Sequence, residues 1–447
     1  MSDNIRIVEN ATCTFCGCVC DDMILTVDVD EKRIIKAKNA CVLGKAWFAE
    51  HTVEDRPYAL IDGQEATTAE GVEVAAQTLA EAQFPVVYGL SDTTNEAQRQ
   101  AVAIADMIGA NLDTTTSVCH GPTGIAFQGV GESTATLGEI KNRADLVIYW
   151  GGNPAESHPR HFTRYSVTPK GMYIPNGKKD RTVVLVDVRR TPSVPVADIF
   201  IQVKPKSDFE VLWALRALVK GRQIDPSIEV RTGVSLETLE DLAERMKNCR
   251  FGVLFFGMGL TMTRGRHFNA GALLALATDL NEYTHFVAKP VRGHGNVTGG
   301  DNVVSWQTGF PFAVNFSRGY PRFNPGEFTT VDLLVRGEAD AALIIASDPA
   351  ANFPKAAIEH MQRIPVIALD PKPTHTTTLA KVAFTTATYG INVPGTVYRM
   401  DDVPIPLRPA FESPYPSDEE ILTAIKNRVQ ELLVAKAANG AQAVLTF

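Results

Sequence analysis

The chain has 447 residues and a formal net charge of -8, from 51 acidic and 43 basic side chains. This excess of acids argues against a general nucleic-acid-binding protein, and no apolar run reaches the roughly 20 residues of a membrane span. The amino end, Met1-Ser2-Asp3-Asn4, lacks the basic and then apolar layout of a signal peptide. We therefore expect a cytoplasmic protein, long enough for two to four domains.

Four of the seven cysteines lie within eight residues near the amino end. Cys13, Cys16 and Cys20 form a C-x2-C-x3-C pattern, and Cys41 follows. Four thiolates are the ligands of an iron–sulfur cube, and short spacings let one loop hold three corners. A closed zinc site is the alternative, although zinc sites more often use two matched C-x2-C pairs. The spacing thus favours iron–sulfur, with Cys18 as a packing thiol beside the ligands.

A lysine follows the fourth thiol closely, in Cys41-Val42-Leu43-Gly44-Lys45. It either neutralises the negative charge of a bound cluster or connects the cluster to a second cofactor. The sequence leaves both interpretations open.

Six short apolar runs follow a predicted connector at residues 51–70. The runs cover residues 85–90, 144–150, 182–187, 251–256, 341–345 and 365–369. Continuous apolar strands that alternate with helical patterns are typical of parallel sheets covered on both faces. We therefore predict an α/β fold, with helices at residues 96–108 and 418–433 among its elements.

Each of the later runs ends in, or is followed by, glycine, asparagine, aspartate or serine. Such residues bring backbone amides and short acceptors close to a ligand at the carboxyl ends of strands. Several such loops in one chain suggest an extended ligand with phosphates and purine-like rings. The alternative is that these residues only turn the chain after each strand.

Cys119 stands in Thr116-Ser117-Val118-Cys119-His120-Gly121-Pro122, after a short strand-like run. Its thiol is therefore expected at a strand's carboxyl end, as a candidate ligand to a catalytic metal. The alternative is a buried small apolar residue beside a hydrogen-bonded histidine. Residues 286–326 break the α/β pattern with many glycines beside Arg292 and His294. They line an active site or form a solvated loop, and the sequence favours neither.

These motifs together resemble the molybdopterin oxidoreductase superfamily. The similarity lies in the cysteine loop, Cys-x-x-Gly-Lys at 41–45, Gly-Gly-Asn-Pro at 151–154, Asp187-x-Arg189 and Asp348-Pro349. Within it, the stretches 117–122 and 290–294 are similar to the family of formylmethanofuran dehydrogenase B subunits, tungsten or molybdenum enzymes that fix carbon dioxide in methanogens. The resemblance extends from about residue 10 to about residue 400.

The resemblance implies reversible two-electron reduction of carbon dioxide to formate. The metal, tungsten or molybdenum, would be held by two molybdopterin guanine dinucleotides and would receive electrons from a 4Fe-4S cluster. Cys119 would be its soft thiolate ligand, while Arg292 would hold a carboxylate and His120 would exchange a proton. Formate would pass to an amidohydrolase-like subunit for condensation with methanofuran. A pterin-binding β-barrel and a polyferredoxin-type subunit are the other expected partners.

The resemblance gives three groups of candidate site residues. The catalytic residues are Cys119, His120 and Arg292, and the metal ligands are Cys13, Cys16, Cys20, Cys41 and Cys119. The cofactor-binding residues are Lys45, Gly152, Asn153, Pro154, His158, Asp187, Arg189, Asp208, Gly257, Gly259, Asp348, Asn352 and Asp370.

The same resemblance suggests a small iron–sulfur domain and two Rossmann-like αβα domains. The predicted iron–sulfur domain covers residues 1–62, and residues 286–330 complete the active-site region. A discontinuous αβα domain at 63–135 and 331–400 carries Cys119, and a second αβα domain at 136–285 binds the pterin. A carboxyl-terminal extension and helix cover residues 401–447. Few residues follow Asp401, so no carboxyl-terminal β-barrel is expected.

Two other functions are compatible with these motifs. A formate dehydrogenase subunit would use the same chemistry and release free formate. A structural subunit of a formyltransferase/hydrolase complex would carry no metal, but the intact Cys119-His120 pair and the complete cysteine set argue against it. The sequence does not distinguish tungsten from molybdenum.

Overall fold

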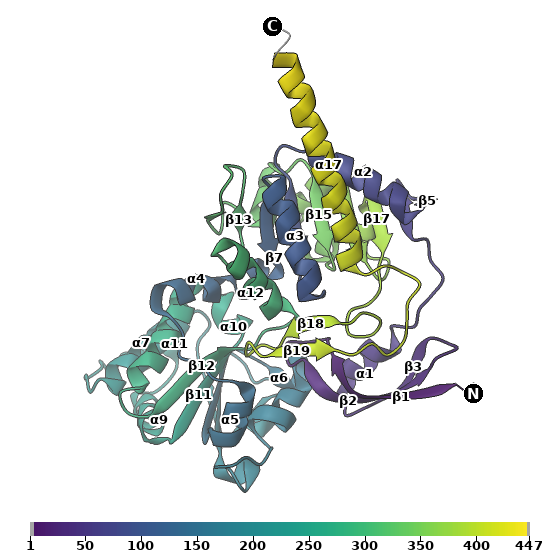
Figure 1. Cartoon of the computed structure of the whole chain (residues 1–447). Helices are drawn as coiled ribbons and strands as arrows, with labels where there is room; N and C mark the ends of the chain where they lie inside the picture. The colour runs from purple at the N-terminus through teal and green to yellow at the C-terminus, as the bar shows by residue number, and fades with distance from the viewer. Residues whose placement is uncertain (1–3, 445–447) are drawn as a thin grey trace.

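The computed structural model describes residues 4–444, so residues 1–3 and 445–447 of the predicted terminal segments lie outside the described residues. The chain forms a mixed α/β structure with two large sheets and a small antiparallel sheet at the amino end (Figure 1). Parallel strands form all of one large sheet and the centre of the other. The predicted α/β class is therefore confirmed.

The first large sheet has five parallel strands in the order β10-β9-β8-β11-β12. They are β8 (Leu146–Trp150), β9 (Thr182–Asp187), β10 (Ile199–Gln202), β11 (Phe251–Phe256) and β12 (His285–Pro290). Helices α4 (Gly121–Val130), α7 (Asp208–Val219), α9 (Leu236–Asn248) and α11 (His267–Leu280) contribute to the core on one face, and α5 (Leu137–Arg143) to that on the other. Short helices α6 (Pro154–Ser157), α8 (Ile228–Thr232) and α10 (Met258–Thr261) lie in the connections.

The second large sheet has the order β14-β13-β7-β6-β15-β16-β17-β4-β5. Its strands are β4 (Ala59–Ile61), β5 (Gln64–Ala66), β6 (Val86–Gly89), β7 (Asn111–Thr114), β13 (Val314–Asn315), β14 (Arg322–Phe323), β15 (Ala342–Ile345), β16 (Val366–Asp370) and β17 (Val382–Thr385). One core contains residues of α2 (Thr68–Glu81), α3 (Asn95–Met107), α12 (Val297–Thr308) and α17 (Asp418–Val444). The other contains residues of α13 (Thr330–Arg336) and α15 (Lys355–Met361).

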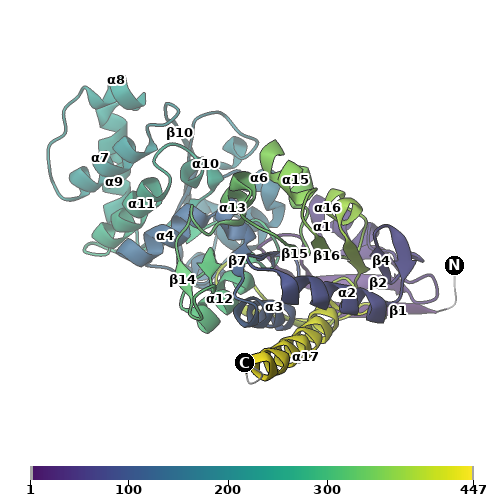
Figure 2. The same cartoon turned by 90° about the horizontal axis from the view of Figure 1, so that it is seen from above.

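Short elements complete this half of the chain. They are α14 (Pro349–Asn352), α16 (His375–Leu379) and the hairpin of β18 (Gly395–Tyr398) and β19 (Pro404–Leu407). Seen from above, α7, α8 and α9 lie at one end of the molecule, and α2, β4 and the N-terminus lie at the other (Figure 2).

Strand β8 shows why continuous apolar runs form the sheet centres. Leu146, Ile148 and Trp150 belong to one hydrophobic core. Val147 and Tyr149 belong to the core on the opposite face. Because alternate residues of a strand point to opposite faces, a strand covered on both sides needs apolar residues at every position.

The amino-terminal sheet shares its core with the five-stranded sheet. It consists of β1 (Ile5–Cys13), β2 (Cys20–Asp28) and β3 (Arg33–Lys38), followed by helix α1 (Val42–Ala49). Met23, Leu25 and Phe48 are fully buried together with Tyr149 and Phe255 of the larger sheet. Three short strands bury too little apolar surface to be stable alone, so this packing fixes the position of the cysteine loop between β1 and β2.

The six predicted strands are present as β6, β8, β9, β11, β15 and β16, and the predicted helices are α3 and α17. The predicted connector at 51–70 is wrong in part, since residues 59–66 form β4 and β5, which extend the sheet beside β17. Strands of three residues at a sheet edge are too short to show a recognisable alternation of apolar and polar residues. The division into domains stays a prediction, although β12 places residues 285–290 in the five-stranded sheet.

Helix α17 packs against α2 and α3 and extends beyond the rest of the molecule (Figure 1). Ile421, Leu422, Ile425 and Val429 are its buried face. Among the residues that the structure describes, none of the helices combines the length and apolar character that a membrane crossing requires.

Candidate active site and cysteine loop

The four predicted cluster ligands line one small cavity. Cys13 ends β1 and is paired in register with Cys20, which begins β2. Cys41 caps the amino end of α1, and its sulfur accepts a hydrogen bond of 3.5 Å from the amide of Gly44. Cys16 and Cys18 line the same cavity.

The donor set and the backbone around the cavity fit a cluster. A Cβ atom on Gly44 would lie 3.1 Å from the sulfur of Cys13 and 3.9 Å from that of Cys41, so only glycine keeps this wall of the cavity clear. Within residues 4–444, no three His, Cys, Asp or Glu side chains converge as they would around a single ion. The iron–sulfur cluster stays a prediction.

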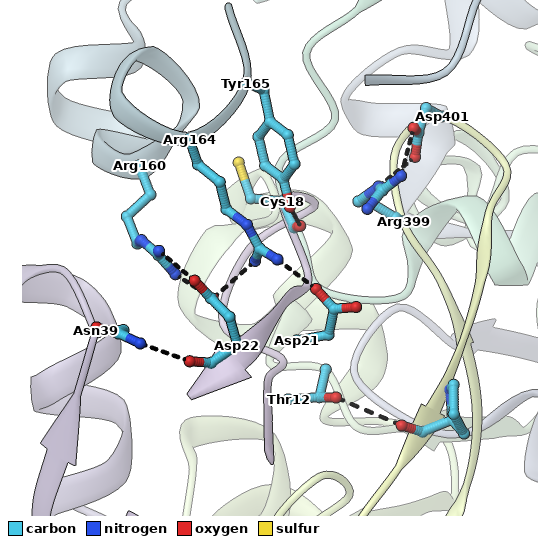
Figure 3. Close-up of polar contacts among 11 residues, drawn as sticks. Thr12, Cys18, Asp21, Asp22, Asn39, Arg160, Arg164, Tyr165, Arg399 and Asp401 are labelled. Carbon is cyan, nitrogen blue, oxygen red and sulfur yellow. Dashed lines mark hydrogen bonds and ion pairs between the residues drawn. The ribbon is translucent and has the colours of Figure 1, made fainter. Parts of the chain in front are cut away.

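Two arginines lie beside the cysteine loop (Figure 3). Arg160 binds both carboxylate oxygens of Asp22 at 2.5 and 2.6 Å, and Arg164 donates to Asp21 at 2.6 Å. A hydrogen bond from Cys18 and the charges of Arg160 and Arg164 lower the pKa of Cys20 to about 7, against the effect of burial. The two arginines therefore stabilise negative charge on the sulfur atoms of the loop.

Cys18 differs from its neighbours. Hydrogen bonds from its thiol to Cys16 and Cys20, together with burial, raise its pKa well above the ordinary value. Cys18 therefore stays a neutral thiol whose single S–H can donate to one of these two sulfurs at a time, as expected of a packing thiol beside the ligands.

The first prediction separates these two kinds of cysteine. Cys16→Ser should strongly lower the iron content of the purified complex, because a hydroxyl replaces one of four ligands. Cys18→Ser should keep iron near the wild-type amount, because serine still donates a hydrogen bond. Iron analysis and the visible absorption of the cluster measure both variants. Equal iron loss in the two variants would make Cys18 a ligand and contradict the assignment.

The cysteine loop packs directly on the segment of Arg292. The amide of Gly17 donates to the carbonyl of Gly293 at 3.0 Å, and Cys16 forms an isolated antiparallel bridge with His294. A Cβ atom on Gly17 would lie 2.3 Å from the Arg292 carbonyl oxygen. Only glycine permits this approach. The cysteine loop and the Arg292 segment therefore form a close junction between the predicted cluster and the predicted catalytic pocket.

The second prediction tests this junction. Gly17→Ala should destabilise the protein by about 1–3 kcal/mol, because the added methyl group overpacks a backbone contact. Gly129→Ala is a matched control on α4, where a Cβ atom meets nothing within 4 Å, and should be neutral or stabilising by up to about 1 kcal/mol. Urea denaturation measures both. Equal stability of the two variants would show that the junction is looser than the structure indicates.

Cys119 and Arg292 meet through a buried network. Cys119 ends a single 3-10 turn after β7, and Arg292 follows β12. Arg292 Nη2 donates to Thr116 Oγ1 at 3.2 Å and forms an ion pair with Asp301 of α12. Thr114 and Thr116 donate to the same carboxylate at 3.0 and 2.9 Å. Asp301 therefore holds the Cys119 loop and Arg292 together.

The electrostatics of this pocket follow from burial and from Arg292. Burial raises the pKa of Cys119, while the charge of Arg292 and a hydrogen bond from the Gly293 amide oppose that rise. Burial and the same charge lower the pKa of His120 to about 3, so its ring is neutral at physiological pH. His120 Nδ1 lies 3.2 Å from Thr123 Oγ1, and its Nε2 is buried without a partner among the described residues.

His158, a predicted cofactor-binding residue, ends α6 in the loop after β8, and its ring contacts the segment of Arg292. Its Nε2 donates to the Arg292 carbonyl at 2.7 Å, and burial lowers its pKa to about 4. The structure therefore places His158 where it fixes the backbone of Arg292.

Most of the other predicted cofactor residues gather at the carboxyl edge of the five-stranded sheet. They are Gly152, Asn153, Pro154, Asp187, Arg189, Asp208, Gly257 and Gly259. Gly257 and Gly259 donate to the carbonyls of Trp150 and Gly151 at 3.0 and 2.9 Å, so these loops pack backbone to backbone. Burial raises the pKa of both Asp187 and Asp208, and the negative charge of Asp187 adds to the rise at Asp208.

Asp348 and Asp370 lie at the edge of the nine-stranded sheet, in a different cavity of about 400 Å³. Phe15 of the cysteine loop and Trp47 of α1 line the same cavity, so it lies between that loop and the sheet. Burial raises the pKa of Asp370 to about 7. Asp348 accepts hydrogen bonds from Thr376, and Asn352 donates to the Asp348 carbonyl at 3.1 Å, so both contribute to local structure. Lys45 is exposed on α1.

Comparison with known proteins identifies the family. No family model matches the chain. It is 44% identical over 438 residues to the B subunit of tungsten-containing formylmethanofuran dehydrogenase 2 from Methanocaldococcus jannaschii, over 96% of this chain and 100% of that protein. It is 41% identical over 444 residues to the protein of the same description from Methanococcus maripaludis, with the same two coverages. The chain belongs to the family of formylmethanofuran dehydrogenase B subunits.

Two solved structures share the fold of this chain. One is the crystal structure of the formyltransferase/hydrolase complex from Methylorubrum extorquens with methylofuran, with a TM-score of 0.69 and 24% identity over 84% of this chain and 99% of that chain. The other is acetylene hydratase from Pelobacter acetylenicus, with a TM-score of 0.70 and 12% identity over 94% of this chain and 69% of that chain. The likeness concerns the fold alone.

Sequence reasoning missed two polar residues of the pocket. Asp301 and Thr116 hold Arg292, yet neither is among the predicted site residues. Asp301 lies in a stretch whose sequence fits either an active-site lining or a solvated loop. No spacing rule connects it to Thr116, which lies 185 positions away.

Proposed function

We propose that this chain is the catalytic subunit of a formylmethanofuran dehydrogenase, in which carbon dioxide is reversibly reduced to formate. The observation that carries the proposal is the convergence of Cys119, His120 and Arg292 in one buried pocket, joined by backbone hydrogen bonds to the cysteine loop. Membership of the family of B subunits supports it. The 4Fe-4S cluster would be held by Cys13, Cys16, Cys20 and Cys41.

The metal, tungsten or molybdenum, and two molybdopterin guanine dinucleotides would supply the two-electron chemistry when bound. Cys119 would be the protein ligand of the metal, since a thiolate suits a soft, redox-active ion. The two strand-end regions, one on each large sheet, offer a place for each dinucleotide. Asp187 and Asp208 would accept hydrogen bonds from guanine or ribose at one of them. Asp370 and its cavity would serve the other.

Arg292 is suited to bind the carboxylate of formate. Both hydrogen bonds that its side chain forms within the described part of the chain, to Thr116 and to Asp301, use Nη2. Nε and Nη1 are therefore left to face a substrate, and a guanidinium holds a carboxylate with two parallel hydrogen bonds. The same cation would stabilise the negative charge that develops on the oxygens of carbon dioxide. The ring of His120 stays neutral at physiological pH, so it would serve the substrate as a hydrogen-bonding group rather than as a charged acid.

The chain would work with other subunits in the cytoplasm. We assign to them the amidohydrolase-like condensation of formate with methanofuran, the β-barrel that completes pterin binding, and polyferredoxin-type electron supply. The formyltransferase/hydrolase complex named for one structural neighbour supports a multi-subunit assembly.

Isotope exchange tests the proposed reaction. The purified complex, supplied with a reduced viologen dye, should transfer label from carbon-13 bicarbonate into formate, or into formylmethanofuran when methanofuran is added. Labelled free formate as the final product in the presence of methanofuran would favour a formate dehydrogenase. An intact complex without exchange and without tungsten or molybdenum would contradict the proposal and favour a structural subunit.

A further inference from the structure

A buried lysine lies three residues before Arg292. Lys289 is on β12, and only 2% of its side chain is exposed. Its Nζ lies 3.8 Å from Asp402 Oδ2, and Asn302 donates to the other oxygen of Asp402 at 3.2 Å. A buried ammonium group is costly unless it is well paired. Here the pairing is long, and 54% of the Asp402 side chain is exposed.

Glu132 lies beside the same strand. The segment after α4 runs along the outer edge of β12, where the Ala288 amide donates to the Ser133 carbonyl at 2.8 Å and Ser133 Oγ donates to the Phe286 carbonyl at 3.0 Å. Oε1 of Glu132 is buried and has no hydrogen-bond partner among the described residues. A buried carboxyl oxygen without a partner is unfavourable, so Glu132 is a candidate functional group.

Three charged groups lie near enough to Glu132 to shift its pKa, although none forms an ion pair with it: Lys289 of β12, Arg292 after β12, and Asp402 in the turn between β18 and β19. Burial raises the pKa of Glu132 to about 7. Lys289 and Arg292 oppose this rise, and Asp402 adds to it. The carboxyl group therefore gains and loses a proton near physiological pH.

Exposure drops sharply from Asp402 toward the pocket. The exposed fraction of the side chain is 54% at Asp402, 2% at Lys289 and 7% at Arg292, which faces Cys119. The series thus begins at solvent and ends at the pocket where we place the reaction.

We propose that Asp402, Lys289 and Glu132 form a proton route between solvent and the Arg292 pocket. The proposal rests on the proposed function. Reduction of carbon dioxide to formate forms one C–H bond and consumes two electrons and one proton. A low-potential one-electron donor protein supplies the electrons through the cysteine loop, and the route supplies the proton from water. During formate oxidation, the electrons and the proton leave the pocket along the same two paths. Glu132 is a positioning and proton-exchanging residue, since it does not touch the substrate.

Infrared spectroscopy tests the proton exchange without any turnover. The pH of the whole complex is stepped from 6 to 8, and the loss of carboxylic acid C=O absorption is followed. Asp113 and Asp370, whose pKa values burial also raises to about 7, contribute in every variant. The wild type minus Glu132→Gln difference should therefore contain one carboxyl that titrates near pH 7. A difference without such a band would overturn the proposal.

The rate of formate oxidation against pH tests the route itself. Glu132 must be ionised to accept the proton, so the wild-type rate should rise as the pH increases through about 7. Glu132→Gln should lose this rise and at least about tenfold in rate at pH 8, while Glu132→Asp keeps the rise. Lys289→Met should resemble Glu132→Gln, and Lys355→Met, at a lysine whose side chain is 90% exposed on α15, should match the wild type.

Iron and tungsten or molybdenum contents are measured in every variant, and rates are compared per bound metal. A Glu132→Gln complex with the wild-type rate and pH profile would overturn the route. An inactive wild-type complex that still shows the titrating Glu132 band would contradict the proposed function and leave the proton exchange supported.

Discussion

Replacing Cys119 by alanine should abolish carbon dioxide reduction and formate oxidation while the iron of the cysteine loop remains. The thiol lies in the buried pocket beside Arg292, and alanine leaves the metal without its protein ligand. Changing a residue that only orients a metal ligand already costs about 10–100-fold, so loss of the ligand itself should lower kcat at least about 100-fold. Because the four cluster cysteines line a separate cavity, the iron content should not change.

Cys249→Ala is the matched control for this variant. Cys249 follows α9, away from both cavities, and its thiol donates to the Met246 carbonyl at 3.2 Å. This control should keep wild-type activity and metal content. A Cys119→Ala complex that turned over at the wild-type rate would remove Cys119 from the site. Loss of iron together with activity would indicate that the variant disturbs the whole junction rather than the metal ligand.

Arg292→Lys should lower kcat by about 100-fold, the typical cost of removing one preorganised contact to a transition state. Lysine keeps the positive charge but loses the planar fork, and its single nitrogen cannot bind Asp301, Thr116 and a carboxylate in the same geometry. Steady-state kinetics of formate oxidation, normalised to bound tungsten or molybdenum, measure the effect.

Arg245→Lys, on the exposed face of α9, is the control for this change. It should retain wild-type kinetics. If Arg292→Lys changed only KM, the guanidinium would bind substrate and transition state equally. If it changed neither constant, Arg292 would have no part in the reaction.

The strands that could be predicted are those with apolar residues at every position. β8 and β11 are buried on both faces, so their sequences are unmistakable. β7, which carries the Cys119 loop, reads Asn111-Leu112-Asp113-Thr114 and shows no such run. Asp113 is fully buried because the amides of Thr330 and Ala313 donate to it at 2.8 and 3.1 Å. Such polar strands depend on partners some 200 positions away, which local patterns do not reveal.

The candidate site shows the same limit. Cys119 and the cysteine loop stand out through short motifs, and the resemblance supplied His120 and Arg292. Asp301, Glu132 and Lys289 belong to no motif, because their meaning depends on contacts between segments far apart in the chain. Asp348, a predicted cofactor-binding residue, accepts hydrogen bonds from Thr376, and its contact with a cofactor stays a prediction.

The central claim is that Cys119 binds a tungsten or molybdenum ion that performs the reaction. X-ray absorption at the tungsten or molybdenum edge tests it most directly, on the purified wild-type complex and on Cys119→Ser. We predict that the metal in the variant has one sulfur neighbour fewer than in the wild type. An unchanged number of sulfur neighbours, or a wild-type complex that is active without either metal, would contradict the claim.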